Sequence, residues 1–274
     1  MIIIGEKING TRKAVGAAIR QRDAERIKQL AREQVQAGCA YLDVNAGTSP
    51  EREPDDMAWL VKTIQETVDI PLCLDSANPA ALKAGLALVK NLPIINSVSG
   101  EKPRIEKVLP LALEYKTGLI LLALDDSLGI PGTSQGRLDI VNRLIEMAKA
   151  GGLKEEQLFV DPLVTAISTG DKNALVTFEA IRMIRQAYPG AHVTCGLSNI
   201  SFGMPLRSLI NQTFMVMCIH MGLDSAIMDP NDRDLTGVIA ASEMLMGQDK
   251  FCQKFNRAYR SGKIGPLNNL TLGG

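Results

Sequence analysis

The chain has 274 residues, 46% of them hydrophobic, and its 30 basic and 30 acidic residues give a formal net charge of zero. That length and apolar fraction suffice for one large core, and they fall within the usual range of a single α/β barrel. A neutral charge balance gives no reason to expect a nucleic acid or an anionic membrane surface as a partner, and no apolar run reaches the roughly 18 residues of a membrane span.

Cysteine usage and the first residues bear on the compartment. The chain opens without the basic region and the long apolar region of a secretory signal, and its five cysteines are scattered, odd in number and without C-x-x-C spacing. These features predict a cytoplasmic protein whose cysteines act as small buried hydrophobic residues. Neither His192 nor His220 has metal-ligand spacing, so we expect no metal site in this chain.

Short apolar runs alternate with helical patterns along the whole chain. Asp23 is a typical helix N-cap, Gly38 a typical helix end and Pro79 a typical first-turn residue. The predicted strands span residues 2–4, 41–44, 70–74, 92–95, 118–124, 158–160, 193–197 and 225–228. The predicted helices span residues 24–37, 54–68, 103–115, 137–150, 173–188, 206–221 and 232–246, with one more that opens at Pro79.

Eight strand–helix units are the number that closes a TIM (β/α)8 barrel. We therefore predict an α/β fold with a single barrel domain over residues 1–262 and a C-terminal tail over residues 263–274. The alternative is an open, doubly wound sheet. The first strand–helix turn, residues 5–11, lacks the G-x-G-x-x-G pattern, and no G-K-[ST] motif occurs, so the sequence does not favour it.

Five of the predicted strands end in Asp or Asn directly after the apolar run. The residues concerned are Asp43 and Asn45, Asp75, Asn96, Asp161, and the pair Ser198 and Asn199. Each one alone could cap a helix or form an ordinary turn. Because the carboxyl ends of barrel strands share the catalytic face, the repetition predicts a polar site at one mouth of the barrel.

Six short motifs in order carry a resemblance to a known family. They are G-E-K-I-N at residues 5–9, L-D-V-N-A-G at 42–47, C-L-D-S at 73–76, I-N-S at 95–97, D-P-L at 161–163 and G-L-S-N-I-S at 196–201. Together they resemble the pterin-binding methyltransferases, in particular the methyltetrahydrofolate:corrinoid-protein methyltransferases and the folate module of cobalamin-dependent methionine synthase. The resemblance implies transfer of the N5-methyl group between 5-methyltetrahydrofolate and the cobalt of a corrinoid.

The resemblance also implies roles for the strand-end residues. A carboxylate can accept two hydrogen bonds from the amino-pyrimidinone edge of a pterin, and Asp75 and Asp161 are the expected acceptors. Asn96 would serve the carbonyl and ring-nitrogen edge, because an amide both donates and accepts. Asp43 and Asn45 would bind neighbouring polar groups or ordered water.

The chemical step needs a group near N5, because tetrahydrofolate is a poor leaving group. By the resemblance, Asn199 is the expected catalytic residue, beside Ser198, and its amide would bond to N5 more strongly as that nitrogen becomes basic. An asparagine is no general acid, so the proton source stays open. Arg207 is expected to contact the pterin or its glutamate tail, with an exposed arginine at a helix start as the equal alternative.

The resemblance also bears on where the corrinoid is held. Neither histidine stands in the D-x-H-x-x-G context of a corrinoid-binding module, so the cobalamin is expected on a separate corrinoid protein. A homodimer is expected by resemblance. Two alternatives remain open: a folate-binding protein without catalysis, and a dihydropteroate synthase-like enzyme, although the N-T-P-D-S-F and R-x-H elements of the latter are missing.

Overall fold

Eight parallel strands form the centre of the structure, hydrogen-bonded in the order β7-β6-β5-β4-β3-β2-β1-β8. They are β1 (Ile2–Asn9), β2 (Tyr41–Asn45), β3 (Leu72–Asp75), β4 (Ile94–Gly100), β5 (Gly118–Asp125), β6 (Leu158–Asp161), β7 (His192–Val193) and β8 (Ser225–Met228). The ends of the sheet meet where the Asp224 amide donates to Val193 (3.3 Å) and the Ile227 amide to Cys195 (3.1 Å). A parallel bridge between Gly196 and Ile227 continues this seam. The sheet is closed, and the predicted TIM barrel is confirmed.

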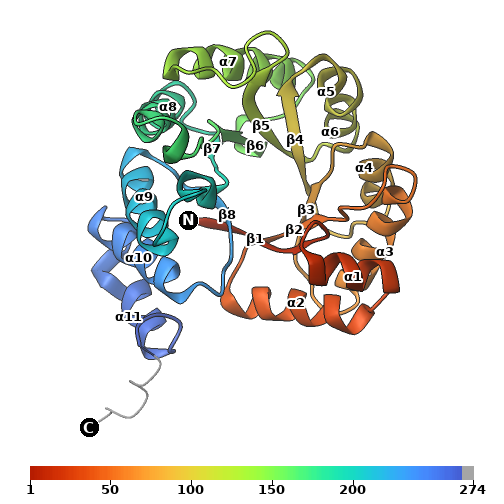
Figure 1. Cartoon of the computed structure of the whole chain (residues 1–274), viewed down its shortest axis with the longest axis horizontal. Helices are drawn as coiled ribbons and strands as arrows, with labels where there is room; N and C mark the ends of the chain where they lie inside the picture. The colour runs from red at the N-terminus through yellow and green to blue at the C-terminus, as the bar shows by residue number, and fades with distance from the viewer. Residues whose placement is uncertain (267–274) are drawn as a thin grey trace.

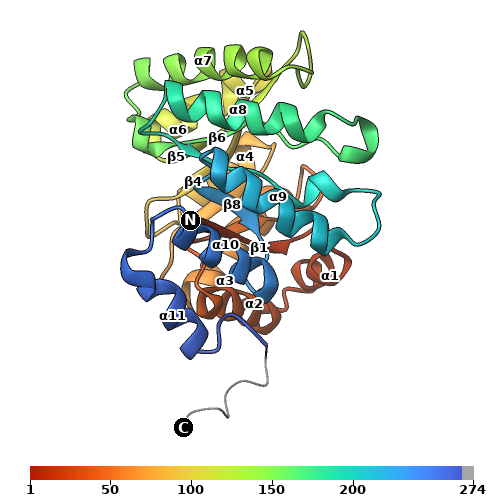
Figure 2. The same cartoon turned by 90° about the vertical axis from the view of Figure 1, so that its left-hand side faces the viewer.

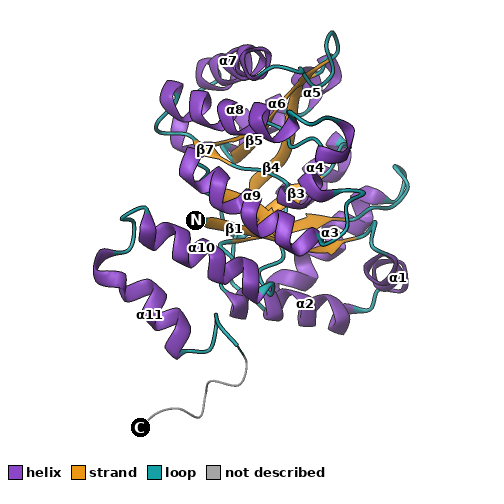
Figure 3. Cartoon of the chain, turned by 60° about the vertical axis from the view of Figure 1, so that its left-hand side comes forward, coloured by secondary structure: helices purple, strands orange, loops and turns teal. Residues whose placement is uncertain are grey.

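The helices surround the strands as an outer ring (Figure 1). The computed structural model describes residues 1–266. Its helices are α1 (Lys13–Gln21), α2 (Ala24–Ala37), α3 (Glu53–Gln65), α4 (Pro79–Leu86), α5 (Lys102–Lys107), α6 (Leu109–Tyr115), α7 (Ser134–Ala150), α8 (Asn173–Ala187), α9 (Arg207–Met221), α10 (Arg233–Leu245) and α11 (Gln253–Arg260). Short 3-10 turns add η1 (Glu155–Gln157), η2 (Ile167–Thr169), η3 (Leu197–Ser201) and η4 (Lys250–Cys252). From the side, α7, α8 and α9 lie next to one another along the barrel, and α11 lies beyond α10 (Figures 2 and 3).

The structure adds two helices to the predicted elements, divides a third and shortens one strand. Helices α1 and α11 were not predicted, and α1 begins after Arg12 without a side-chain cap, so its start has no sequence signal. The predicted helix at 103–115 is two helices, because Pro110 in the first turn of α6 cannot continue the turn before it. The predicted strand at 193–197 is a regular strand only at its start. It meets β8 again at the Gly196–Ile227 bridge, and the chain then turns into η3, whose Ser and Asn residues favour turns.

The barrel encloses its own apolar layer. Five buried side chains fill the interior: Ile4, Cys73, Ile94, Ile120 and Phe159. A larger apolar shell lies between the strands and the helices. All five cysteines are free, and four are buried as predicted, whereas Cys252 is exposed because it lies on η4 outside the barrel.

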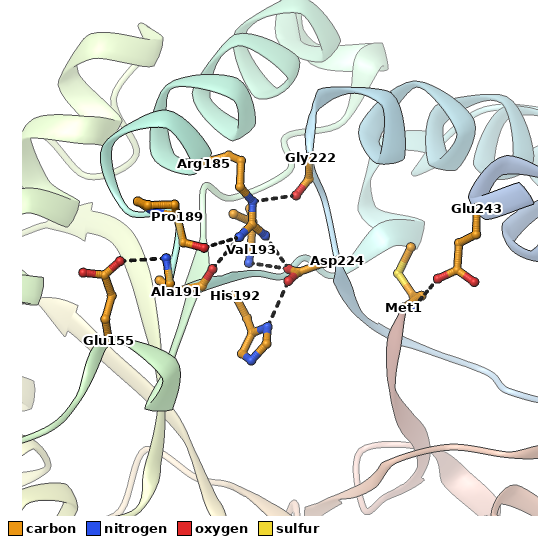
Figure 4. Close-up of polar contacts among 11 residues, drawn as sticks. Met1, Glu155, Arg185, Pro189, Ala191, His192, Val193, Gly222, Asp224 and Glu243 are labelled. Atoms are coloured by element: carbon orange, nitrogen blue, oxygen red, sulfur yellow. Dashed lines mark hydrogen bonds and ion pairs between the residues drawn. The ribbon is translucent and has the colours of Figure 1, made fainter. Parts of the chain in front are cut away.

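An arginine joins α8 to the strands at the amino-terminal end of the barrel (Figure 4). Arg185 donates from Nε to the Gly222 carbonyl (3.1 Å) and from Nη1 to the Ala191 carbonyl (2.7 Å). Its Nη2 pairs with Asp224 at 2.7 Å, and the same carboxylate contacts Nδ1 of His192 at 2.9 Å. This cluster fixes the connection between α8, β7 and β8 far from the carboxyl ends of the strands.

The last described residues pack against α10. Ile264 is buried, and Arg233 donates to the Gly265 carbonyl at 2.8 Å. The expected tail falls largely on residues 267–274, which lie outside the described part of the chain. Within residues 1–266, no helix combines the length and apolar character that crossing a membrane requires.

Candidate functional site

Carboxylate and amide side chains gather inside the carboxyl end of the barrel. Tyr41, Cys73, Ile94 and Phe159 belong to the interior layer. Because strand side chains alternate between faces, the residues two or four positions further along the same strands also face the interior, nearer to the mouth. These are Asp43 and Asn45 on β2, Asp75 on β3, Asn96 on β4 and Asp161 on β6. The predicted strand-end residues therefore share one end of the barrel.

Two hydrogen bonds join three neighbouring strands at this end. Asn45 donates from Nδ2 to Oδ2 of Asp75 at 2.8 Å, and Asn96 donates from Nδ2 to Oδ1 of Asp43 at 3.3 Å. Asp43 is nearly inaccessible to solvent, while Asn45, Asp75 and Asn96 are half-buried. The network leaves the exposed sides of Asp75 and Asn96 free to meet a ligand.

The environment of the two carboxylates disfavours their ionised forms. Burial raises the pKa of Asp43 well above its usual value, and the nearby Asp75 raises it further. Burial also raises the pKa of Asp75, and Glu53 adds to this, whereas the Asn45 hydrogen bond and the Arg104 charge lower it. A ligand that offers N–H donors to this pair would relieve the desolvation of both carboxylates.

Asp161 lies at the end of β6 and is 7% exposed. It accepts a hydrogen bond from the Leu163 amide at 2.7 Å and one from the Gly196 amide. Burial raises its pKa to about 6, while these two amides and the charge of Arg137 act in the opposite direction. Asp161 is therefore a preoriented acceptor whose charge is present only above mildly acidic pH.

Asn199 lies on η3, directly after β7, and its side chain is exposed. Its Nδ2 atom lies 3.2 Å from the position that a Cβ atom on Gly196 would occupy. Since the Gly196 amide also bonds to Asp161, Asn199 stands beside the Asp161 edge of the mouth. This placement lets one ligand contact both residues.

Arg207 braces the turn that carries Asn199. It donates from Nη2 to the Ser198 carbonyl at 2.8 Å and from Nε to Oγ of Ser201 at 3.0 Å. The Ser198 side chain itself is exposed. These contacts hold η3 in place, and the pterin contact that the resemblance implied for Arg207 stays a prediction.

Several charged residues at this end were not singled out from the sequence. Glu6, on the inward-facing side of β1, pairs with Arg12, and its charge raises the pKa of Asp43. Arg137 lies in the first turn of α7, buried beneath the turn after Asp161. Arg137 lies three and four residues before the buried Ile140 and Val141, so the helical period places it on the buried face of α7. That periodicity could have identified Arg137 as a buried residue from the sequence.

Metal-binding residues are not clustered here. Within residues 1–266, no group of three or more His, Cys, Asp or Glu side chains is arranged to hold a metal ion. The chemistry of the mouth is that of hydrogen-bond acceptors, amides and one buried guanidinium.

Comparison with known proteins agrees with this geometry. Residues 5–229 match the family model described as pterin binding enzyme. The chain is 43% identical over 269 residues to the methylcorrinoid:tetrahydrofolate methyltransferase of Eubacterium limosum, covering 97% of this chain and 99% of that protein. It is 31% identical over 240 residues to the methionine synthase of Mycobacterium tuberculosis, covering 83% of this chain but 20% of that much longer protein.

Solved structures with the same fold include dihydropteroate synthases. That of Clostridium difficile has a TM-score of 0.69 and 18% sequence identity, covering 90% of this chain and 96% of the other. The enzyme of Coxiella burnetii has a TM-score of 0.65 at 16% identity. At these identities the likeness shows the barrel fold alone.

Proposed function

This chain belongs to the pterin-binding enzyme family, and we propose that it transfers a methyl group between the N5 atom of tetrahydrofolate and the cobalt of a corrinoid carried by a separate protein. The observation that carries the proposal is the 43% identity to a methylcorrinoid:tetrahydrofolate methyltransferase over almost the full length of both chains. The mouth of the barrel supplies acceptors suited to a pterin, at the motifs that the resemblance named.

Pterin recognition rests on the strand-end acceptors. Asp75 and Asp161 face the barrel axis from β3 and β6, on either side of Asn96 on β4. The amino-pyrimidinone edge offers adjacent N–H donors, and a carboxylate accepts two such bonds in one plane. Asn96 then serves the neighbouring carbonyl and ring nitrogen, while Asp43 and Asn45 hold it and Asp75 in place.

The name of the bacterial relative writes the methylcorrinoid as donor, and we propose this direction for the chain. The N5 lone pair attacks the methyl carbon, the N–C bond forms, and the Co–C bond breaks with both electrons remaining on cobalt. The N5 proton then passes to solvent water. Asn199 accepts a hydrogen bond from N5–H as charge develops on that nitrogen, and the same contact assists the reverse reaction.

An anaerobic assay with free methylcob(III)alamin and tetrahydrofolate tests the function. We expect enzyme-dependent appearance of the cob(I)alamin absorbance together with an equal amount of 5-methyltetrahydrofolate. A chain that binds the folate without producing either product would be a folate-binding protein. Condensation of a pterin pyrophosphate with 4-aminobenzoate would indicate a dihydropteroate synthase instead.

The corrinoid partner has to reach the same mouth. Two loops there expose large apolar side chains: Leu128 and Ile130 after β5, and Phe202 and Leu206 after η3. Exposed apolar groups rimming a polar site are typical of a protein-binding surface. We propose that the corrinoid protein docks on these loops. Replacing Phe202 and Leu206 by Ser should reduce transfer to a protein-bound corrinoid while sparing transfer to free cobalamin.

We also propose a cytoplasmic homodimer. Helix α9 exposes Leu209, Val216 and Met217, and an apolar groove of about 510 Å³ lies between α8 and α9. The surface supports pairing with a second copy, because two such faces would cover each other. The free cysteines support a reducing compartment. A Leu209→Glu, Met217→Glu double variant should run as a monomer in light scattering if the pairing uses this face.

A further inference from the structure

Arg137 is a buried arginine at the mouth end of the helical ring. It is 2% exposed, although arginine is among the residues most rarely buried. Its Nε donates to the Pro131 carbonyl at 3.0 Å, and its Nη1 donates to the carbonyls of Pro162 (3.0 Å) and Leu163. The Thr177 hydroxyl, on α8, lies 3.4 Å from Nη1. One guanidinium thus joins the loop after β5, the loop after β6 and helix α8.

The carbonyls that Arg137 holds belong to the turn that orients Asp161. Pro162 and Leu163 directly follow that aspartate, and the Leu163 amide donates to its Oδ1 atom at 2.7 Å. Leu163 has a φ of 66°, a left-handed conformation that costs energy for a residue with a side chain. Arg137 donates to the Pro162 carbonyl before the Leu163 Cα atom and to the Leu163 carbonyl after it. These hydrogen bonds offset the cost of the left-handed conformation and fix the turn.

We propose that Arg137 is the positioning residue for the pterin-binding carboxylate of Asp161, because it holds the carbonyls of the turn whose amide orients that carboxylate. Arg137 approaches from α7, outside the barrel, and acts on the ligand only through Asp161. The inference rests on the proposed function, because it takes Asp161 as a pterin acceptor.

The charges around Asp161 support this role. Burial raises its pKa to about 6, and Arg137 is the one charged side chain found to lower it among the described residues, beside the amides of Leu163 and Gly196. Burial raises the pKa of the Cys195 thiol, and the nearby Cys218 and Asp161 raise it further, which leaves the thiol neutral. Removing Arg137 therefore shifts the Asp161 pKa upward.

The test is the pH dependence of tetrahydrofolate binding by the full chain, measured by titration in the wild type, Arg137→Met and Arg137→Lys. Wild-type affinity should fall as the pH drops through about 6. Arg137→Met loses both the charge and the hydrogen bonds to the turn, so its midpoint should move to higher pH and its affinity should fall at every pH. The loss should be about tenfold to a hundredfold at pH 7 and smaller, but still present, in more alkaline buffer. Arg137→Lys keeps the positive charge but loses the planar guanidinium that donates to several carbonyls. Its binding midpoint should therefore equal that of the wild type, while its affinity should be lower at every pH.

Arg185→Met is the matched control. Arg185 also holds backbone carbonyls, at Gly222 and Ala191, but at the opposite end of the barrel (Figure 4). Its replacement should lower the melting temperature without moving the binding midpoint. An Arg137→Met midpoint equal to that of the wild type, or an equal shift in Arg185→Met, would overturn the proposal.

A measurement without folate separates the inference from the proposed function. Carbon-13 NMR of the free protein reports the titration of the Asp161 carboxyl directly, and its midpoint should rise in Arg137→Met whether or not the folate binds. If that variant fails to fold, Arg137→Lys decides: unchanged folate affinity in a folded lysine variant contradicts the positioning role. Failure of the wild type to bind tetrahydrofolate would count against the proposed function alone.

Discussion

Asp161 shows at the scale of one residue how a buried carboxylate opposes stability. Its pKa of about 6 in the folded chain exceeds the ordinary value of 3.8, so the folded state binds this proton more tightly than the unfolded state. The carboxylate therefore destabilises the fold above about pH 6, and the cost disappears as the pH falls toward 3.8. The protein retains an ionised acceptor at neutral pH at the expense of stability.

Replacing Asp161 by Asn should exchange function for stability. The amide oxygen can still accept from the Leu163 amide, so we expect the unfolding free energy to rise at pH 7.5 by up to about 3 kcal/mol. The gain over wild type should shrink toward zero near pH 4, and tetrahydrofolate binding should weaken at neutral pH. Denaturant melts at both pH values check this. An equal gain at both would mean that the ionisation of Asp161 is not its cause.

Asn199 is exposed on η3, which suits a residue that acts on the ligand more than on the fold. We expect Asn199→Ala to slow single-turnover methyl transfer at saturating folate by about 10²-fold, with a much smaller loss of affinity. The same replacement at Asn256, exposed on α11, is the control. Near wild-type transfer by a folded Asn199→Ala variant would remove this residue from the mechanism.

The site residues differ in how far the sequence could reveal them. Asp75 and Asp161 follow apolar runs, and strand alternation alone places them inside the barrel. The clamp by Arg137 depends on carbonyls of two loops that come together only in the folded chain. The contact of Arg207 with η3 likewise required the structure, because an arginine at a helix start has the same sequence pattern whichever way it points.

At the scale of elements, two loops of the mouth touch backbone to backbone. A Cβ atom on Gly10, after β1, would lie 1.8 Å from the carbonyl oxygen of Ala46, after β2. Gly47, with a φ of 58°, belongs to the same contact, because a Cβ atom on it would lie 2.6 Å from the Gly10 carbonyl carbon. This close approach sets the position of Asn45, which bonds to Asp75.

Gly10→Ala should therefore force the two loops apart. We expect a loss of about 2 kcal/mol or more in unfolding free energy, of the size seen for overpacked sites, together with weaker folate binding through Asn45. Gly132→Ala is the control, since nothing lies within 4 Å of its added methyl group. Thermal melts and a binding titration measure both effects. Equal melting temperatures for the two variants would show that the loops after β1 and β2 can move apart at little cost in stability.

Sequence patterns placed the elements well where a single period dominates. The strand at Ser225–Met228 lies at its predicted bounds, and α2 begins after Asp23 and ends before Gly38 as predicted. The departure at β7 has a physical cause. The regular strand ends at Val193, contact with β8 continues through Cys195 and Gly196, and the backbone enters η3 at Leu197, where Ser and Asn residues favour a turn.

For the whole molecule, backbone pairing is sparsest where the sheet closes. β7 has two residues, and its backbone contact with β8 rests on the Asp224 and Ile227 amides and one bridge, whereas β4 and β5 pair from Ile94 to Gly100. Local opening follows the least-bonded segments. We therefore expect the Ile227 amide to exchange with solvent faster than the amides between β4 and β5.

Folate binding should slow exchange at that seam. A pterin held by Asp75 on β3 and by Asp161 and Asn199 on the β6–η3 side would restrain β7 from moving away from β8, so opening would first require release of the ligand. Hydrogen exchange of the free and tetrahydrofolate-bound chain measures this, with the β4–β5 amides as internal reference. Protection of Ile227 should grow with ligand concentration and should be largely lost in Asp161→Asn at neutral pH. If folate protected the Ile227 amide and the β4–β5 amides equally, the ligand would stabilise the barrel as a whole. The residues at the mouth would then have no specific effect on the contact between β7 and β8.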